Sequence, residues 1–344
     1  MPVLVAYRVP KADPAGIAAR DRRLLTIAEA TAEAGLLCVY ECLGDVLGLG
    51  RFHAVPVVPE RGEIRLHRRL GGGRPVPLGE GYFGVSLALP NPSTLATGGA
   101  TRLKPEQVLN RAVRGVLAAL ETLGVSGYYP GRDVVTAGRK IIGAITLEID
   151  PSGKTLVEMA VAANRSFAEV TSFLDRADPT GVVPADAVLP GHATSIAEET
   201  GLRTTLDTFA DAVAAGFVAR LGMACVPAEE PLPPVQADDD WLLAGRLPPH
   251  LDRYGAARTA LGSLQARVAL GGGRIADLRL TGDFIASAAA ITRMETSLRD
   301  MVPDRAAILD RVNKALAGPM DFLLGVRPLE IIADVVMQAC DGAA

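Results

Sequence analysis

The sequence predicts an α/β (α+β) protein with two domains. Residues 1–227 read as a mixed β-sheet with packed helices, residues 228–237 as a linker, and residues 238–344 as a small α+β domain. Three observations predict this organisation. Strand-like apolar runs alternate with amphipathic helical segments, a stretch rich in proline and acidic residues interrupts them, and a hairpin pattern followed by helices comes after it. A chain of 344 residues is long enough for two such domains.

Two segments of the larger domain have the apolar spacing of helices. Residues 15–35 repeat leucine and alanine at helical intervals, and Gly35 follows as a candidate C-cap. Residues 104–124 have the clearest helical pattern, with Pro105 in the first turn and valines and leucines along one side. Two further helices are expected in this domain, at residues 166–174 and 202–222.

The strands of the larger domain are predicted from apolar runs that end at turn residues. "LLCVYECLG" and "DVLGLGRF" are joined through Gly44-Asp45, and "EIRLHRRL" ends at a triple glycine. "YFGVSLALP" is apolar throughout, as expected of a buried strand. Residues 132–164 read as three strands joined by tight turns at Ala137-Gly138 and at "DPSG".

A break in composition separates the two domains. Residues 226–240, "VPAEEPLPPVQADDD", hold four prolines and five acidic residues. We expect no helix and no central strand in such a stretch, which is typical of a linker. After it, "SLQARVAL" and "RIADLRLTGDF" flank a second triple glycine as a hairpin, and helices follow from about residue 287.

Composition disfavours several classes of function. The net charge of −4 gives no overall attraction to nucleic acid or to an anionic membrane, and an aromatic content of 4% leaves few rings for base stacking. No run of about 18 apolar residues occurs, and the first residues lack a signal-peptide pattern. We therefore expect a cytoplasmic protein without a nucleic-acid or membrane partner.

The cysteines and histidines do not have the spacing of a metal site. None of the four cysteines forms a C-x-x-C pair, and the four histidines are scattered without an H-x-x-x-H pattern. Cys38 and Cys42 are expected on one face of a strand as small, half-buried side chains. A structural zinc site is not expected.

The two glycine triplets differ in their neighbours. Gly271–Gly273 joins two alternating strands, so a hairpin turn explains it. Gly71–Gly73 follows Arg68 and Arg69 and precedes Arg74. Successive glycines allow backbone N–H groups to approach an anion, and arginine adds bidentate bonds, but a solvated turn explains the same residues. The triplet lacks the patterns of a P-loop and of a dinucleotide fingerprint.

Lys140 is a second candidate for contact with an anion. It lies in the strand-like segment "GRDVVTAGRKIIGAI", flanked by isoleucines. Its ammonium either extends to the surface along an apolar strand or points at an anionic ligand, and both interpretations stay open on this pattern alone.

Together these stretches resemble the lipoate-protein ligase family of the biotin/lipoate ligase superfamily. "LGLGRF", "RRLGGG" and "GRDVV…GRKIIGA" look like three of its motifs, in the family's order. "GGGRIADLRLTGDFIAS…ITRMETSLRDM" looks like its small C-terminal accessory domain. The resemblance covers most of the chain, although each motif alone is only moderately specific.

The resemblance implies a reaction and a set of site residues. Lipoate and ATP, usually with Mg²⁺, would give lipoyl-adenylate, and a lysine of a lipoyl-domain carrier protein would then accept the acyl group as an amide. Gly71, Gly72, Gly73, Arg68 and Arg69 would hold the acyl-adenylate or the triphosphate. Lys140 would contact the acyl carbonyl and the α-phosphate, and Asp133 would contact Mg²⁺ or the ribose. The further substrate-binding and ATP-binding positions that the resemblance implies are Arg74, Val76, Arg132, Gly143 and Ala144.

The chain departs from the family pattern at several places. One residue, Leu70, separates the arginines from the glycines where the family usually has two, and Pro77 stands near the family's histidine. Ile142 replaces a serine, and Glu158 stands at a later His-Gly. These departures leave open octanoate or another acid as substrate, an ATP-independent acyl transferase, or a non-catalytic relative that binds a lipoyl domain. The absence of cysteine between Cys42 and Cys225 excludes a cysteine nucleophile at the positions used by related octanoyltransferases.

Overall fold

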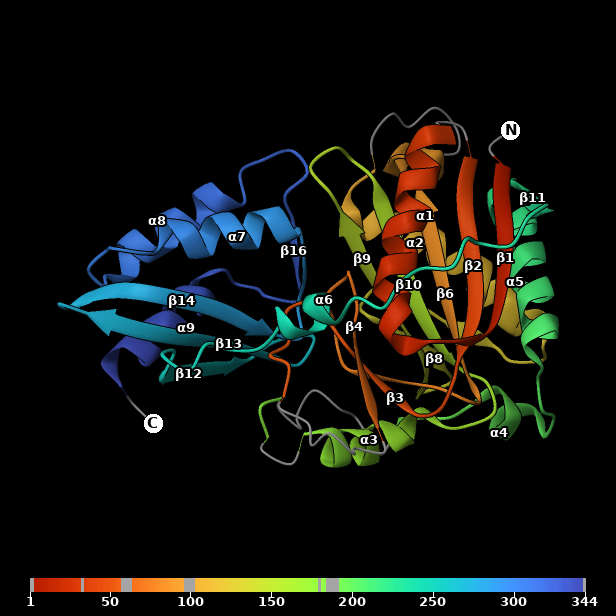
Figure 1. Cartoon of the computed structure of the whole chain (residues 1–344), viewed down its shortest axis with the longest axis horizontal. Helices are drawn as coiled ribbons and strands as arrows, with labels where there is room; N and C mark the ends of the chain where they lie inside the picture. Colours follow the sequence, from red (N-terminus) through yellow and green to blue (C-terminus); the bar gives the residue numbers. More distant parts are fainter. Residues whose placement is uncertain are drawn as a thin grey trace.

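The protein has two lobes that lie side by side (Figure 1). The computed structural model describes residues 3–31, 34–56, 64–95, 103–178, 181–183 and 192–342. Each lobe has its own apolar core, and the two cores meet at the boundary, where Phe52 packs into the smaller core and Ile285 into the larger. The predicted α/β (α+β) fold is confirmed.

The larger lobe is built on a mixed sheet that has eight strands among the described residues. Their order is β11-β1-β2-β6-β10-β9-β8-β7. β1 pairs in parallel with β2 and β11, and the other pairs are antiparallel. The strands are β1 (Val3–Ala12), β2 (Ala34–Cys42), β6 (Tyr82–Leu89), β7 (Gly127–Tyr128), β8 (Val134–Ala137), β9 (Lys140–Ile149), β10 (Thr155–Ala162) and β11 (Ala224–Pro227).

Helices cover both faces of this sheet. α1 (Ile17–Thr31) crosses β2, β6 and β10 at the front of Figure 1. On the opposite face, α5 (Leu206–Leu221) packs its Phe209 ring 5.2 Å from the ring of Phe83, and α2 (Pro105–Thr122) packs on α5. The predicted helices at 104–124 and 202–222 are confirmed. In the part of the chain that the structure describes, no helix has the length and apolarity needed to cross a bilayer.

The expected C-cap at Gly35 is wrong. α1 ends at Thr31, and Gly35 lies inside β2. A Cβ atom at Gly35 would lie 2.7 Å from a methyl of Leu4 and 2.8 Å from one of Leu89. Glycine here gives two leucine side chains room to pack against the strand and does not end a helix.

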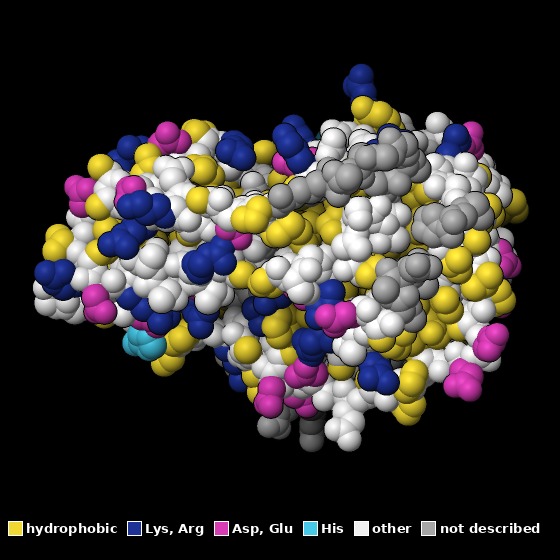
Figure 2. All heavy atoms as spheres, turned by 90° about the horizontal axis from the view of Figure 1, so that it is seen from above, with side chains coloured by type: hydrophobic (Ala, Val, Ile, Leu, Met, Phe, Trp, Pro, Cys, Tyr) yellow, Lys and Arg dark blue, Asp and Glu magenta, His cyan; other side chains and the backbone are white. Residues whose placement is uncertain are grey.

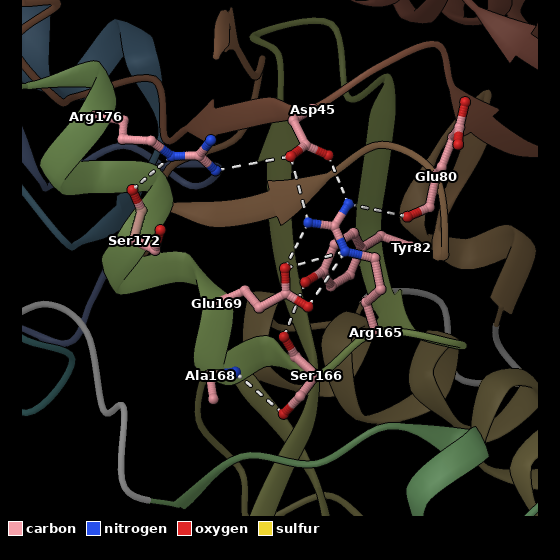
Figure 3. A network of polar contacts seen from close by, with 9 residues as sticks. All are labelled: Asp45, Glu80, Tyr82, Arg165, Ser166, Ala168, Glu169, Ser172 and Arg176. Carbon is pink, nitrogen blue, oxygen red and sulfur yellow. Dashed lines mark hydrogen bonds and ion pairs between the residues drawn. The ribbon is translucent and has the colours of Figure 1, made fainter. Parts of the chain in front are cut away.

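A small second sheet, ordered β4-β3-β5, lies beside the large one. Its strands are β3 (Val46–Leu49), β4 (Arg65–Arg68) and β5 (Val76–Leu78). Arg165 lies just after β10 and connects the two sheets (Figure 3). Its guanidinium lies 2.5 Å from Asp45 and also binds Glu169, which precedes α3 (Val170–Ala177). The same guanidinium lies 5.2 Å from the Tyr82 ring centroid. A bidentate arginine of this kind fixes the geometry of both partners.

The smaller lobe combines a three-stranded antiparallel sheet with helices. The strands are β12 (Arg253–Arg258), β13 (Ser263–Gly271) and β14 (Arg274–Gly282), and the helices are α7 (Ala288–Ser297), α8 (Arg305–Ala315) and α9 (Glu330–Asp341). A two-stranded sheet of β15 (Ile285–Ala286) and β16 (Leu323–Leu324) adjoins the larger lobe. Gly272 and Gly273, at φ +57° and +75°, form the β13–β14 turn, so the predicted hairpin is confirmed.

Two turn and linker predictions need correction. The β8–β9 turn consists of Gly138 and Arg139, because Ala137 pairs with Lys140. Residues 226–240 contain parts of a strand and of a helix, contrary to the expectation of a linker without either. β11 takes in Val226 and Pro227 at the sheet edge, where proline is tolerated, and α6 (Asp239–Leu243) begins after the N-cap side chain of Asp238.

Close helix packing in the larger lobe depends on Gly216. A Cβ atom at this position would lie 2.1 Å from the carbonyl oxygen of Gly115, so Gly216→Ala must separate α5 from α2. We expect the free energy of unfolding to fall by about 1–3 kcal/mol. Urea unfolding followed by circular dichroism measures this change. Gly271→Ala is the control, since its Cβ would lie 3.5 Å from Ala276 Cβ, an ordinary van der Waals contact. Equal midpoints for the two variants would contradict the packing argument.

Candidate active site

The triple glycine Gly71–Gly73 is buried between the large sheet and the smaller lobe. The Gly71 N–H donates to Oε2 of Glu158 at 2.6 Å, and the Gly73 N–H donates to the carbonyl oxygen of Phe284 at 2.9 Å. A solvated turn does not describe this loop, because all three glycines are buried. The anion next to the Gly71 N–H is the protein's own Glu158 carboxylate.

Side chains would not fit at these glycines. A Cβ atom at Gly71 would lie 2.9 Å from Oε2 of Glu158, and one at Gly72 would lie 2.1 Å from the Phe284 carbonyl oxygen. Gly50 has the same restriction, because its Cβ would lie 2.2 Å from the carbonyl oxygen of Gly73. The residue type at Gly50 and Gly72 therefore follows from close backbone approach, and that at Gly71 from the side chains of Thr146 and Glu158.

The two arginines before the glycines point to different surroundings. Arg69 is 5% exposed, lies among Glu158, Asp133 and Asp283, and donates to the carbonyl oxygen of Arg74. Arg68 donates to the carbonyl oxygens of Arg51, at 2.7 Å and 3.0 Å, and of Trp241, at 3.1 Å. Successive side chains leave a strand in opposite directions, so only Arg69 stays with the glycine loop.

Arg74, which is partly exposed, forms an ion pair with the buried Asp133 next to the loop. Nε of Arg74 donates to Oδ2 of Asp133 at 2.6 Å, and Asp133 is 2% exposed. Burial raises the pKa of Asp133, while the Arg74 charge acts in the opposite direction. Among the described residues, Oδ1 of Asp133 has no hydrogen-bond partner.

The donors around Asp133 do not make a resident magnesium site. Within the described part of the chain, no group of three or more His, Cys, Asp or Glu side chains could hold a metal ion. Asp133 offers one oxygen beside the positive charge of Arg74, which disfavours a second cation. The residues therefore fit Mg²⁺ poorly unless phosphate oxygens supply further ligands.

Glu158 is the main residue of this region that was not among the site residues predicted from the sequence. Burial, followed by the charge of Asp21, raises the pKa of Glu158 to about 7, while Arg69 and the loop N–H groups lower it. An acidic residue inside the apolar strand "TLVEMAVA" was the available signal. Thr146 of β9 lies opposite Glu158 and also faces Gly71.

Lys140 lies apart from the glycine loop. It is the first residue of β9, its side chain is 58% exposed, and its Nζ lies 3.2 Å from Oε1 of Glu199. Thr146, which contacts the loop, is six residues further along β9, roughly 20 Å at the usual strand rise. The buried positions Gly143 and Ala144 lie between them, and Val76 is buried in β5.

Arg132 lines a cavity of about 230 Å³ between the two lobes. The apolar residues of its lining are Leu109, Ala260, Leu261, Ile285, Leu323 and Leu324. Ile285 also connects the cavity to the glycine loop, since a Cβ at Gly73 would lie 3.5 Å from its side chain. Arg327 and Glu106 also line this cavity. An apolar cavity whose lining holds two arginines and one carboxyl can take up a chain that ends in a carboxylate or phosphate.

Comparison with solved structures gives the class of fold. P. falciparum LipL1, solved in complex with lipoate, superposes with a TM-score of 0.68 at 10% identity, covering 97% of this chain and 99% of that one. A lipoate-protein ligase A bound with ATP gives a TM-score of 0.48 at 14% identity, covering 71% and 93%. A putative lipoate protein ligase from T. acidophilum with bound lipoic acid gives 0.45 at 14% identity, covering 71% and 93%. The TM-score of 0.68 shows that the chain shares the fold of P. falciparum LipL1.

The family itself follows from the sequence match. Residues 19–218, more than half of the chain, match the model of the lipoyl protein ligase A/B catalytic domain. The chain belongs to that family, and the resemblance found in its motifs is confirmed. No curated protein matches the sequence significantly.

The raised pKa of Glu158 predicts a pH-dependent stability. The folded state holds this proton more tightly than the unfolded chain, so wild type loses stability as pH rises from about 4.5 through about 7. Glu158→Gln keeps an oxygen acceptor for Gly71 and removes the titration. Relative to this variant, we expect wild type to lose up to about 3 kcal/mol of unfolding free energy between about pH 5 and pH 8.

Glu199→Gln is the control for this titration. Hydrogen bonds from Thr194 and Lys140 lower the pKa of Glu199, so its contribution to stability is already complete above the ordinary glutamate pKa. Between about pH 5 and pH 8, the difference in urea midpoint between wild type and Glu199→Gln should therefore stay constant. A constant difference between wild type and Glu158→Gln would contradict a titrating carboxyl at the loop.

Proposed function

We propose that the protein is a lipoate-protein ligase that activates lipoate with ATP to lipoyl-AMP and transfers the lipoyl group to a lysine of a lipoyl carrier domain. The family match over residues 19–218 carries this proposal. The similarity to P. falciparum LipL1, a protein crystallised with lipoate, supports lipoate as the substrate. Octanoate, which has a comparable chain, is the alternative acid.

The accessible residues of the predicted site are the ones that can contact substrate without a rearrangement. Arg132 lies exposed in the lining of the apolar cavity and would bind the carboxylate or phosphate end of an acyl chain held there. Lys140 is exposed, and an exposed ion pair such as that with Glu199 costs little to break. Its ammonium would offset charge on the acyl carbonyl and the α-phosphate.

The buried residues of the predicted site have a supporting role in this proposal. Arg69, Arg74 and Asp133 are held in ion pairs and hydrogen bonds at the base of the glycine loop. Their hydrogen bonds and ion pairs would orient the loop. Mg²⁺ would enter bound to the phosphates of ATP, since the buried Asp133 beside Arg74 makes no magnesium site of its own.

One observation favours a second candidate function, which is acyl transfer without ATP or binding of a lipoyl domain without catalysis. The Glu158 carboxylate accepts the hydrogen bond from the Gly71 N–H that a phosphate would otherwise accept. Transfer through an acyl-cysteine is not a part of this candidate. Burial raises the pKa of Cys38 to about 11 and that of Cys42 to about 12, so neither thiol forms a thiolate near neutral pH.

Lipoate-dependent release of pyrophosphate from ATP tests the proposed activity. We expect wild type to release pyrophosphate with Mg²⁺ present, and Lys140→Ala to lose roughly 100-fold or more of the rate because charge stabilisation is removed. Lys154→Ala is the matched control. Lys154 lies in the β9–β10 turn, at the other end of β9, and pairs with Glu29 and Asp150. Its replacement should leave the rate unchanged.

Two results would contradict parts of this proposal. Absence of pyrophosphate release by wild type with both lipoate and octanoate would reject an ATP-dependent ligase for these acids and leave the second candidate. Release that Lys140→Ala and Lys154→Ala reduce equally would reject the specific role of Lys140.

A further inference from the structure

A short segment before α5 is fastened beside the beginning of β9. The Thr194 N–H donates to the Ile141 carbonyl oxygen at 2.8 Å. Helix α4 (Ile196–Thr200) follows, and the Ala197 N–H donates to the carbonyl oxygen of Ala163, just after β10, at 2.9 Å. Because backbone hydrogen bonds hold the segment at both strands, its side chains keep a fixed place next to the first residue of β9.

The side chains of this segment form a closed ring of contacts with Lys140. Oγ1 of Thr194 donates to Oε1 of Glu199 at 2.7 Å, and Nζ of Lys140 lies 3.2 Å from the same oxygen. The ring closes through the backbone, because Thr194 is bound to Ile141, the neighbour of Lys140. Thr194 is fully buried, so its hydroxyl fixes the position of the carboxylate.

Only one of two adjacent glutamates takes part in this ring. Hydrogen bonds from Thr194 and Lys140 lower the pKa of Glu199, so its carboxylate is charged at neutral pH. Glu198, the preceding residue of the same helix, makes no side-chain hydrogen bond or ion pair with the other residues that the structure describes. The chain thus contains a matched carboxylate for comparison with Glu199.

The ring differs from an ordinary ion pair of the surface. Figure 2 shows acidic and basic side chains intermixed over the larger lobe, seen from above. In the pair of Arg220 with Glu121, the side chains are 53% and 70% exposed, and the entropy lost in ordering both of them offsets much of their attraction. Next to Lys140, the buried Thr194 has already ordered the carboxylate, so the pair orders only the lysine.

The ring leaves the Lys140 ammonium available to a substrate. Its side chain is 58% exposed, and the contact with Glu199 uses one of its three N–H donors. The remaining donors can bind oxygens of an acyl carbonyl or of a phosphate while the ion pair persists. A lysine side chain has many rotamers, so an anchored ammonium loses less entropy when it meets the reacting atoms.

We propose that Glu199, held by Thr194, is a positioning residue for Lys140. This inference rests on the proposed ligase function, in which Lys140 contacts the acyl carbonyl and the α-phosphate. Glu199 acts through Lys140 and does not itself contact the substrate. It confines the ammonium to the beginning of β9, so that a substrate meets a cation that is already in place.

Steady-state kinetics of lipoate-dependent pyrophosphate release test this role. In Glu199→Ala we expect kcat to fall roughly three- to ten-fold and KM for ATP to stay within about two-fold, because the ammonium is present but no longer confined. Glu199→Gln keeps an acceptor oxygen for Thr194 and Lys140 and should restore most of the rate. Glu198→Ala removes the neighbouring carboxylate of α4 and is the matched control, with the rate of wild type expected.

A double-mutant cycle separates positioning from a structural effect. If Glu199 acts through Lys140, adding Glu199→Ala to Lys140→Ala leaves the residual rate unchanged within about two-fold. A further loss as large as that in the wild-type background would overturn the proposal, and so would equal rates for Glu199→Ala and Glu198→Ala. A rate above that of wild type in Glu199→Ala would also overturn it, because the ion pair would then withhold the lysine from substrate.

A measurement that needs no ligase activity distinguishes failure of this inference from failure of the proposed function. Limited acetylation with acetic anhydride, followed by mass spectrometry, reports the accessibility of the Lys140 amine. We expect acetylation about two- to five-fold faster in Glu199→Ala than in wild type or Glu198→Ala, since the ion pair no longer competes with the reagent. If wild type releases no pyrophosphate, the ligase function fails and this ratio alone decides whether Glu199 holds Lys140. Equal acetylation in the two glutamate variants overturns the inference.

Discussion

The close approach of three backbone segments at the triple glycine is the constraint on which the rest of the structure depends. The loop carbonyl of Gly73 meets Gly50, Gly72 meets the Phe284 carbonyl of the smaller lobe, and Gly71 meets Glu158 on the sheet. Side chains at these positions would force the segments apart. Because the segments touch, the loop joins both sheets of the larger lobe to the smaller lobe with almost no intervening space.

Polar contacts at this junction tie the lobes together more strongly than apolar packing alone would. Nε2 of His53 lies 2.8 Å from Oδ1 of Asp283, both side chains being buried, and the Phe52 and Phe284 rings stack at 4.6 Å. Separating the lobes would expose these rings and leave a buried carboxylate without its histidine. The lobe boundary is therefore a built interface rather than a loose linker contact.

Local sequence patterns predicted the helices and strands better than they predicted which residues lie around each site residue. α2 and the β13–β14 hairpin follow from periodicity and glycine placement within one segment. β1 was not predicted, because Arg8 and Pro10 interrupt its apolar alternation. The opposite directions of Arg68 and Arg69 follow from strand geometry, but which of them faces the glycines depends on the tertiary fold. The separation of Lys140 from the loop depends on strand register, which motif order does not contain.

The division of charge between the two sides of the loop has one cause. Arg68 and Arg69 are neighbours at the end of β4, so the strand sends one guanidinium inward and one toward the other lobe. The inward one meets Glu158, Asp133 and Asp283, and its charge is balanced by carboxylates of the chain itself. The outward one meets Arg51 and Arg279, and carbonyl dipoles alone accept its hydrogen bonds. The glycine loop is thus internally satisfied by carboxylates, whereas carbonyl dipoles alone offset the outward guanidinium.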